Sequence, residues 1–94
     1  MVLLNKRLLA KLLMESASAV TAATLWADDV IRFHWRDRED VMKAYPNARF
    51  LAGSMATFPL GSEGCSVTVQ IAFNTGVVII LATSANNKLS EVRL

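Results

Sequence analysis

Residues 65–73 read Cys-Ser-Val-Thr-Val-Gln-Ile-Ala-Phe, and this stretch decides the fold class. Apolar residues alternate there with small or polar ones, which is the period of a β-strand with one buried face and one open face. A tight turn at residues 74–76 leads into residues 77–82, an unbroken apolar run typical of a central strand covered on both faces or against a partner. The back half of the chain is therefore predicted to be a β-sheet.

Three shorter segments complete the predicted sheet. Residues 49–52 and 55–60 are strand candidates on either side of a Gly-Ser pair, and residues 1–4 form a further short strand. Pro59 places the 55–60 strand at an edge or at a bulge, because proline cannot donate a ladder hydrogen bond.

The front half of the chain has helical spacing. Leucines at 8, 9, 12 and 13 predict a first amphipathic helix. A second helix is expected to begin at Ser16 or Ser18, either of which can cap it, and Trp26 is expected to hold that helix against the sheet. Its predicted apolar stripe consists of Val20, Ala23, Ala27, Val30 and Ile31.

A short third helix is predicted over residues 38–45. Asp37 is placed to cap it, and the acidic residues at 39 and 40 fall in its first turn, where they favour the helix dipole. Pro46 and Asn47 end this helix. The resulting fold class is α+β, with two or three N-terminal helices packed on a twisted antiparallel sheet of three to five strands.

The composition fits a single globular domain over residues 1–94. Hydrophobic residues make up 53% of the 94 residues and charged residues 19%, which excludes a disordered chain. No apolar run approaches the roughly 18 residues of a membrane span, so no membrane association is expected. The single cysteine, Cys65, is predicted to be a core thiol rather than a reactive one, which favours the cytoplasm.

The N-terminus has an alternative interpretation. Asn5-Lys6-Arg7, followed by an apolar segment and Ala17-Ser18-Ala19, loosely imitates a signal peptide with a small-residue cleavage site. Lys11 interrupts the segment that should be uncharged, which favours an amphipathic helix.

Net charge is only +2, but the charge is unevenly distributed. Eight of the ten basic residues lie at or before Arg49, whereas residues 50–87 contain one charged side chain, Glu63. Attraction to phosphate must therefore come from the first half of the chain. The loose basic set with interleaved aromatic residues that could meet RNA is Arg32, Arg36, Arg38, Lys43 and Arg49, with Phe33, Trp35 and Tyr45.

Each candidate patch also has a structural explanation. The basic set is partly cancelled by the acidic residues at 37, 39 and 40, so it could be a solvated face. Lys6, Arg7 and Lys11 could meet an acidic antitoxin or ribosomal RNA, or could be the polar side of the first helix. The open strand face of Ser66, Thr68 and Gln70 could bind RNA through hydrogen bonds, or could simply be solvated.

Motifs for other chemistries are missing from the sequence. His34 is the only histidine and could act as a base, or could pack against or cap the end of the second helix. With one histidine and one distant cysteine, neither a metal site nor any other cofactor is expected. The sequence also contains no glycine-rich phosphate loop and no nucleophile-elbow motif.

From Trp26 onward the chain resembles the HigB toxin family, in the RelE-like class of mRNA interferases. The resemblance rests on the order and spacing of Trp26, Trp35, DVMKAYPNARF at residues 40–50, Phe58 and the strand-turn-strand of residues 67–80. It implies a RelE-like fold in which helices cover one sheet face, and the other face, with the C-terminal strand, holds mRNA in the ribosomal A site. It also implies RNA cleavage by attack of a 2′-hydroxyl on the neighbouring phosphate, which needs a base, an acid and cations.

The chain departs from the family where that chemistry should be. The family's lysine, tyrosine and arginine at the start of the long strand are replaced by Gly64, Cys65 and Ser66, and three later basic positions by Gln70, Ala72 and Leu81. Near the C-terminus, Asn86 stands in place of a histidine and Leu89 in place of a tyrosine, with Lys88 the only cation nearby. Asparagine cannot exchange a proton near neutral pH.

Three hypotheses follow. The first is the toxin of a type II toxin–antitoxin system, a ribosome-dependent endoribonuclease whose cleavage is weak or lost, with a helix-turn-helix antitoxin, the ribosome and mRNA as partners. The second is an inactive relative that binds an antitoxin or the ribosome. The third is an unrelated small α+β domain. On the toxin hypothesis, the catalytic candidates are Asn86, Lys88 and Ser66, and the RNA-binding candidates are Gln70, Arg49, Lys43, Arg36 and Arg38.

Overall fold

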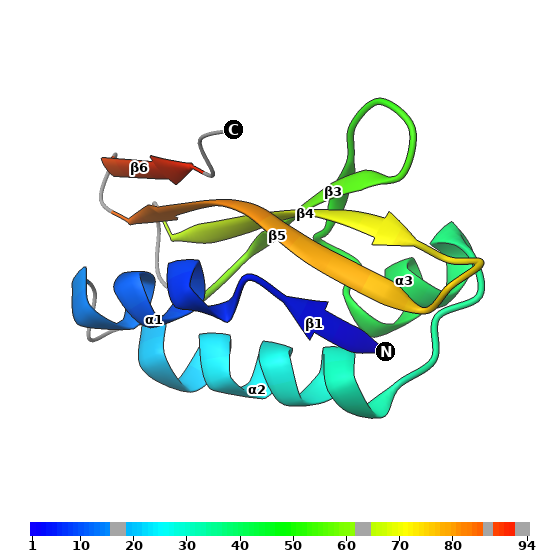
Figure 1. Cartoon of the computed structure of the whole chain (residues 1–94), viewed down its shortest axis with the longest axis horizontal. Helices are drawn as coiled ribbons and strands as arrows, with labels where there is room; N and C mark the ends of the chain where they lie inside the picture. The colour runs from blue at the N-terminus through cyan, green and yellow to red at the C-terminus, as the bar shows by residue number, and fades with distance from the viewer. Residues whose placement is uncertain (16–18, 62–64, 86–87, 92–94) are drawn as a thin grey trace.

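The computed structural model describes residues 1–15, 19–61, 65–85 and 88–91, which form three helices and one six-stranded sheet (Figure 1). The predicted α+β class is confirmed. The elements in chain order are β1 (Val2–Leu4), α1 (Lys6–Glu15), α2 (Val20–Arg32), α3 (Arg38–Ala44), β2 (Arg49–Phe50), β3 (Met55–Pro59), β4 (Ser66–Ala72), β5 (Val77–Ala85) and β6 (Lys88–Glu91).

Strand β5 lies in the middle of the sheet, whose strand order is β1-β5-β4-β3-β2 with β6 also paired to β5. Along one side of β5, strand β4 pairs with residues 77–84. The other side is shared, because β1 pairs with residues 77–79 and β6 with residues 82–85. The prediction of a central strand is therefore confirmed.

The prediction of a twisted antiparallel sheet of three to five strands is confirmed in part: four strand pairs are antiparallel, but the sheet also has one parallel pair and a sixth strand. Strand β1 runs parallel to β5, with Val2 opposite Val77 and Leu4 opposite Ile79, and β6 is a sixth strand. Alternation of apolar and polar residues predicts which face a strand buries, but not the direction of its neighbour. The direction of β1 follows from the path of the chain, which passes through three helices before the antiparallel strands begin.

A left-handed residue turns the chain from β1 into α1. Asn5 has φ +70°, and its side-chain amide donates to the carbonyl of Ile80 at 2.9 Å. Asparagine is among the few residues that tolerate this conformation. The turn places the buried Leu8, Leu9 and Leu12 of α1 against the sheet, where Thr83 donates its hydroxyl hydrogen to the carbonyl of Leu8 at 3.4 Å.

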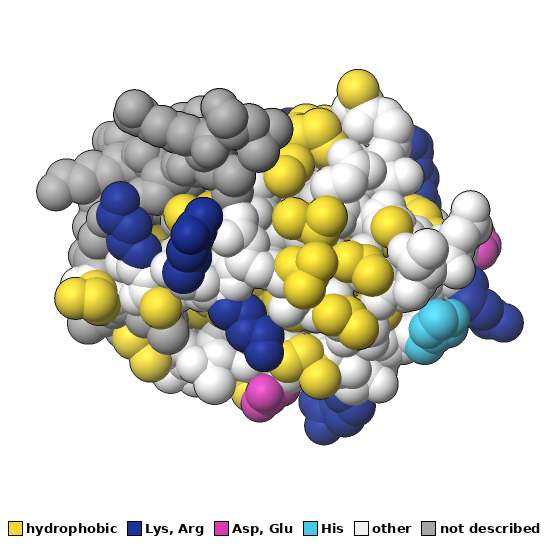
Figure 2. Space-filling model, in the orientation of Figure 1, with side chains coloured by type: hydrophobic (Ala, Val, Ile, Leu, Met, Phe, Trp, Pro, Cys, Tyr) yellow, Lys and Arg dark blue, Asp and Glu magenta, His cyan; other side chains and the backbone are white. Residues whose placement is uncertain are grey.

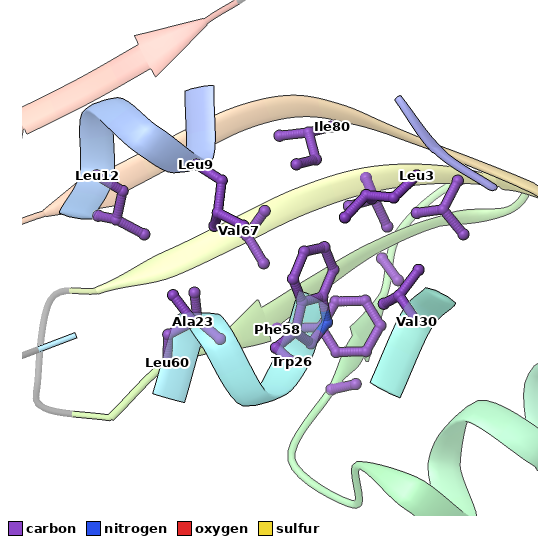
Figure 3. Packing of buried hydrophobic residues seen from close by; sticks show 14 of the residues in the cluster. Leu3, Leu9, Leu12, Ala23, Trp26, Val30, Phe58, Leu60, Val67 and Ile80 are labelled. Atoms are coloured by element: carbon purple, nitrogen blue, oxygen red, sulfur yellow. The ribbon is translucent and has the colours of Figure 1, made fainter. Parts of the chain in front are cut away.

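The hydrophobic core lies between the sheet and helices α1 and α2, which cover the same face (Figures 1 and 3). Trp26 is fully buried at its centre, and its ring contacts that of Phe58 at a centroid distance of 5.5 Å. The ring of Trp35 also stacks on Phe58, with a centroid distance of 6.0 Å and an interplanar angle of 13°. The prediction that Trp26 holds α2 against the sheet is confirmed.

Details of the helices differ from the predictions. The described part of α2 has Ala19 at its N-cap with no side-chain capping bond, and the proposed capping residues Ser16 and Ser18 lie outside the described residues. Val20 and Ile31, expected in the buried stripe, are 40% and 49% exposed, because the buried face is centred on Trp26.

Helix α3 begins as predicted. The carboxylate of Asp37 accepts from the backbone N–H of Asp40 at 3.0 Å.

The core position of Cys65 is also confirmed. Pro59 ends β3 beyond the two residues that pair with β2, so its missing N–H leaves no gap on that side of the ladder. No helix among the described residues is both long and apolar enough to cross a membrane.

Candidate functional site

The sheet face opposite the helices is not covered by α1 or α2, and its side chains can be assigned from the strand register. Gln70 lies opposite Met55 on one side and Ile79 on the other, so these three side chains form one row. In the next row, Thr68 lies opposite Thr57 and Ala82. We call this surface the open face.

A β-bulge adjusts the pattern of β5. The register shifts between Thr68 and Val69, so that Leu81 is an extra residue between the paired Ile80 and Ala82. Ile80 and Thr83 therefore both point to the helices and are buried, whereas Leu81 and Ala82 are partly exposed. Within the described residues, the apolar run of β5 is covered by the protein's own chain on one face only.

The middle of the open face is polar. The hydroxyl oxygens of Thr57 and Thr68 are 2.9 Å apart and hydrogen-bonded. The side chain of Gln70 has no hydrogen-bond partner within the described part of the chain, and it lines a hollow of about 440 Å³ at the end of the sheet. The prediction that Ser66, Thr68 and Gln70 share a partly exposed face is confirmed. The other residues lining the hollow are Ser54, Ile71, Ala72, Phe73, Asn74 and Thr75.

The three catalytic candidates are not brought together by the described residues. Ser66 lies on the open face, opposite Pro59 and Ser84. Lys88 begins β6 opposite Ala85, and only its backbone is described; Asn86 lies outside the described residues. The described side chains of the open face therefore include no group that exchanges protons near neutral pH.

The five RNA-binding candidates fall in three places. Gln70 and Arg49 share the open face, since Arg49 pairs with Thr57. Arg38 lies at the β2–β3 hairpin, where its guanidinium donates to the carbonyl of Gly53 and lies 5.0 Å from the Phe50 ring centre. Arg36 and Lys43 line a separate hollow beside α3.

This second hollow, which we call the α3 pocket, has a volume of about 600 Å³. Asp40 accepts from the backbone N–H of Arg36 at 2.9 Å and from its Nε at 3.4 Å. The backbone hydrogen bond and the nearby guanidinium hold the pKa of Asp40 below its usual value, so this carboxylate is ionised at neutral pH. The residues that line the pocket are Phe33, His34, Trp35, Arg36, Asp40, Lys43 and Ala44.

His34 lies at the edge of the α3 pocket and beside the turn between β4 and β5. Its Cε1 is 3.8 Å from the position that a Cβ on Gly76 would take, and Gly76 itself has φ +72°. The ring is exposed. This position places the ring of His34 at the end of the sheet, and the interpretations of His34 as a base or as a packing residue both stay predictions.

A hydrogen bond between α2 and the end of α3 was not predicted. The Tyr45 hydroxyl donates to Oδ2 of Asp29 at 2.5 Å, and the other oxygen of that carboxylate pairs with Arg32 at 2.9 Å. Burial, and then the hydrogen bond to Asp29, raise the pKa of Tyr45 above its usual value. The two partners are 16 residues apart in the chain, and no sequence pattern indicates that they are in contact.

An apolar patch adjoins the polar part of the open face. Val2 is 56% exposed and Leu4 is 45% exposed, and both lie in register with partly exposed residues of β5. Figure 2 shows hydrophobic side chains gathered over the middle of the molecule, where β1 and β5 run in Figure 1. Lys and Arg side chains gather over α1, where Lys6, Arg7 and Lys11 are exposed as the polar side of that helix.

Comparison with protein-family models and with curated proteins finds no match for this chain. Within the described residues, no group of three or more His, Cys, Asp and Glu side chains could hold a metal ion. The candidate functional site must therefore be interpreted from its own geometry.

Proposed function

We propose that this chain is a HigB-like protein of a toxin–antitoxin pair that retains the binding surface of a RelE-like toxin but has little or no RNA-cleaving activity. The observation that carries the proposal is the open face: helices cover one side of the sheet, and the other presents hydrogen-bonding groups without acids or bases among its described side chains.

The polar side chains of the open face support the proposal that this face binds RNA. A strand pair that exposes Gln70, Ser66 and the Thr57–Thr68 pair offers donors and acceptors to the sugar and phosphate oxygens of RNA. Arg49 adds one positive charge in the same row as the threonines. With so few cations, binding must depend more on hydrogen bonds and shape than on charge.

The chemistry of the same residues supports the loss of cleavage. Removing one proton-transfer group typically lowers the rate by about 10² to 10⁴, and neither Ser66 nor Gln70 can replace such a group. Lys88 and Asn86 are the remaining candidates, and asparagine cannot act as a general acid or base.

Expression of the whole chain in bacterial cells tests both parts. We expect messenger RNAs to keep their normal ends and the protein to co-sediment with ribosomes. Gln70→Glu should reduce co-sedimentation, because it places a negative charge where phosphate would approach. The matched control is Thr24→Glu, which makes the same change in charge on an exposed residue of α2.

Three results would contradict the proposal in different ways. New mRNA ends in register with codons, lost in Lys88→Ala, would show an active endoribonuclease. Absence of the wild-type protein from the ribosome fraction would remove the support for a ribosome-binding role. An equal effect of the two glutamate variants would show that the open face is not the surface in contact.

A further inference from the structure

The α3 pocket shares no lining residue with the hollow of the open face, and it combines exposed cations with aromatic and imidazole rings. Its volume of about 600 Å³ is within the range of roughly 300–1,000 Å³ that small-molecule sites occupy, and it is a shallow hollow, wide open to solvent. Its walls come from two parts of the chain: the connector between α2 and α3, with Phe33, His34 and Arg36, and the side of α3 that carries Asp40 and Lys43.

The connector is held at both ends, so the pocket exists without a ligand. The backbone N–H of Phe33 donates to the carbonyl of Asp29 at 2.8 Å, and that of Arg36 donates to the carboxylate of Asp40. Between them, Trp35 points inward, is only 3% exposed and stacks on Phe58. The neighbouring side chains of His34 and Arg36 are consequently directed outward, and both are exposed.

The charges of the pocket favour an anion. Arg36 contacts Asp40 through Nε, which leaves its two terminal nitrogens without a partner within the described residues. Lys43 has no ion-pair partner in the described part of the chain. One carboxylate therefore faces two cations, and the uncompensated donors are those best suited to phosphate oxygens.

The rings of the pocket favour a flat partner. Phe33 is 41% exposed and has the guanidinium of Arg32 over its ring at 5.5 Å from the centroid, and the ring of His34 is exposed. Aromatic and imidazole rings stack on nucleobases with little dependence on sequence. A nucleotide is the ligand class that carries both a phosphate and such a base.

We propose that the α3 pocket binds one nucleotide, with its phosphate on Arg36 and Lys43 and its base against His34 or Phe33. The nucleotide could be free or part of a single-stranded RNA, and both present the same phosphate and base. Arg36 and Lys43 are also RNA-binding candidates of the toxin hypothesis, so the site deepens the proposed function, but it uses none of the residues of the open face.

The experiment is a titration of the whole chain followed by NMR, with three probes: adenosine monophosphate, a short single-stranded oligoribonucleotide and inorganic phosphate. We expect the signals of His34, Arg36, Lys43 and the Trp35 indole to shift together. Stronger binding of the oligonucleotide than of the mononucleotide would assign the pocket to RNA, and the reverse would assign it to a free nucleotide. Either result supports the proposed site.

Charge reversal distinguishes the pocket from general attraction. Lys43→Glu should weaken nucleotide binding about tenfold or more, the loss expected for one charge-assisted hydrogen bond. It should also reduce the salt dependence of oligonucleotide binding by about one unit of slope. Lys11→Glu makes the same change in charge on the exposed side of α1 and should weaken binding less than about twofold.

Three results would overturn the proposal: no shifts with either nucleotide probe, equal losses in the two variants, or phosphate shifting the same signals at the same concentration as the mononucleotide. The last result would show a simple anion site. Thermal unfolding of both variants checks that each is folded at the temperature of the titration. Because the readout is binding at named residues, it is unaffected by whether the protein contacts ribosomes.

Discussion

Trp26 is the residue on which the core depends most. It is fully buried between α2 and the sheet, and its indole N–H has no hydrogen-bond partner among the described residues (Figure 3). Replacing it with alanine removes a large side chain from a site that cannot collapse, which typically costs about 3–5 kcal/mol. For a domain of this size, that is a large part of the total stability. We expect Trp26→Ala to be mostly unfolded at 37 °C. Circular dichroism at that temperature measures the folded fraction.

Trp26→Phe is the matched control for that prediction. It keeps a ring next to Phe58 and removes the buried donor that lacks a partner. Its free energy of unfolding, measured in urea, should therefore lie much closer to that of the wild type. Equal destabilisation by the two substitutions would mean that the indole nitrogen is satisfied or that the ring shape itself is essential.

Tyr45 is predicted to stabilise the fold in a pH-dependent way. Its pKa is raised in the folded state, so above about pH 10 the unfolded chain loses the phenol proton while the folded chain keeps it. The contribution of the Tyr45–Asp29 hydrogen bond is thus complete below about pH 10 and lost as the pH rises further. Tyr45→Phe should lower the free energy of unfolding by about 1 kcal/mol at neutral pH.

Urea denaturation of wild type and Tyr45→Phe at neutral and strongly alkaline pH checks this prediction. The difference between the two proteins should shrink above about pH 10, because only the wild type then loses stability from this group. A difference that stays constant with pH would indicate that the phenol of Tyr45 ionises normally in the folded protein.

Single residues were predicted well where their role is local. Asp37 was predicted as a cap because an acidic residue before a helix can satisfy free amides nearby in sequence, and Cys65 as a core residue because it begins an apolar alternation. The Tyr45–Asp29 bond was missed because it joins two helices whose mutual position depends on packing around Phe58.

At the scale of an element, α3 offers a direct test of its cap. Asp37→Ala removes the acceptor for the Asp40 N–H and should lower the free energy of unfolding by about 1 kcal/mol. Asp37→Asn is the control, because asparagine also caps helices and should retain most of the stability. Equal losses measured in urea would show that the negative charge, rather than the hydrogen bond, is what α3 requires.

The sequence predicted most elements, because each has a strong local pattern. Alternation predicted β4, the turn at Gly76 predicted the β4–β5 hairpin, and leucine spacing predicted α1. Strand β6 was missed, since its four residues Lys-Leu-Ser-Glu have too few positions to establish a period. The extension of β5 to Ala85 was missed because small and polar residues follow its apolar run.

At the scale of the whole molecule, long-range arrangement was the least predictable feature. The parallel pairing of β1 with β5 joins residues 2–4 to residues 77–79, and no local pattern encodes it. The predicted RNA-binding residues were grouped by sequence proximity, but α3 turns the chain so that Arg36 and Lys43 line one pocket while Arg49 reaches the open face. Basic residues that are close together in the sequence therefore lie on separate surfaces of the folded protein.

The two-layer arrangement makes a final prediction about adjacent residues of β5. Ile80 is fully buried under the helices, whereas Ile79 is partly exposed on the open face in register with Gln70. Ile80→Lys should destabilise the protein by about 4 kcal/mol or more, because it buries an unpaired charge. Ile79→Lys should cost less than about 1 kcal/mol, since its ammonium group can reach water. Urea unfolding of the two variants compares the two faces at matched chemistry. If Ile79→Lys unfolded the protein as well, the open face would have to be covered, and neither RNA nor a partner could approach Gln70 there.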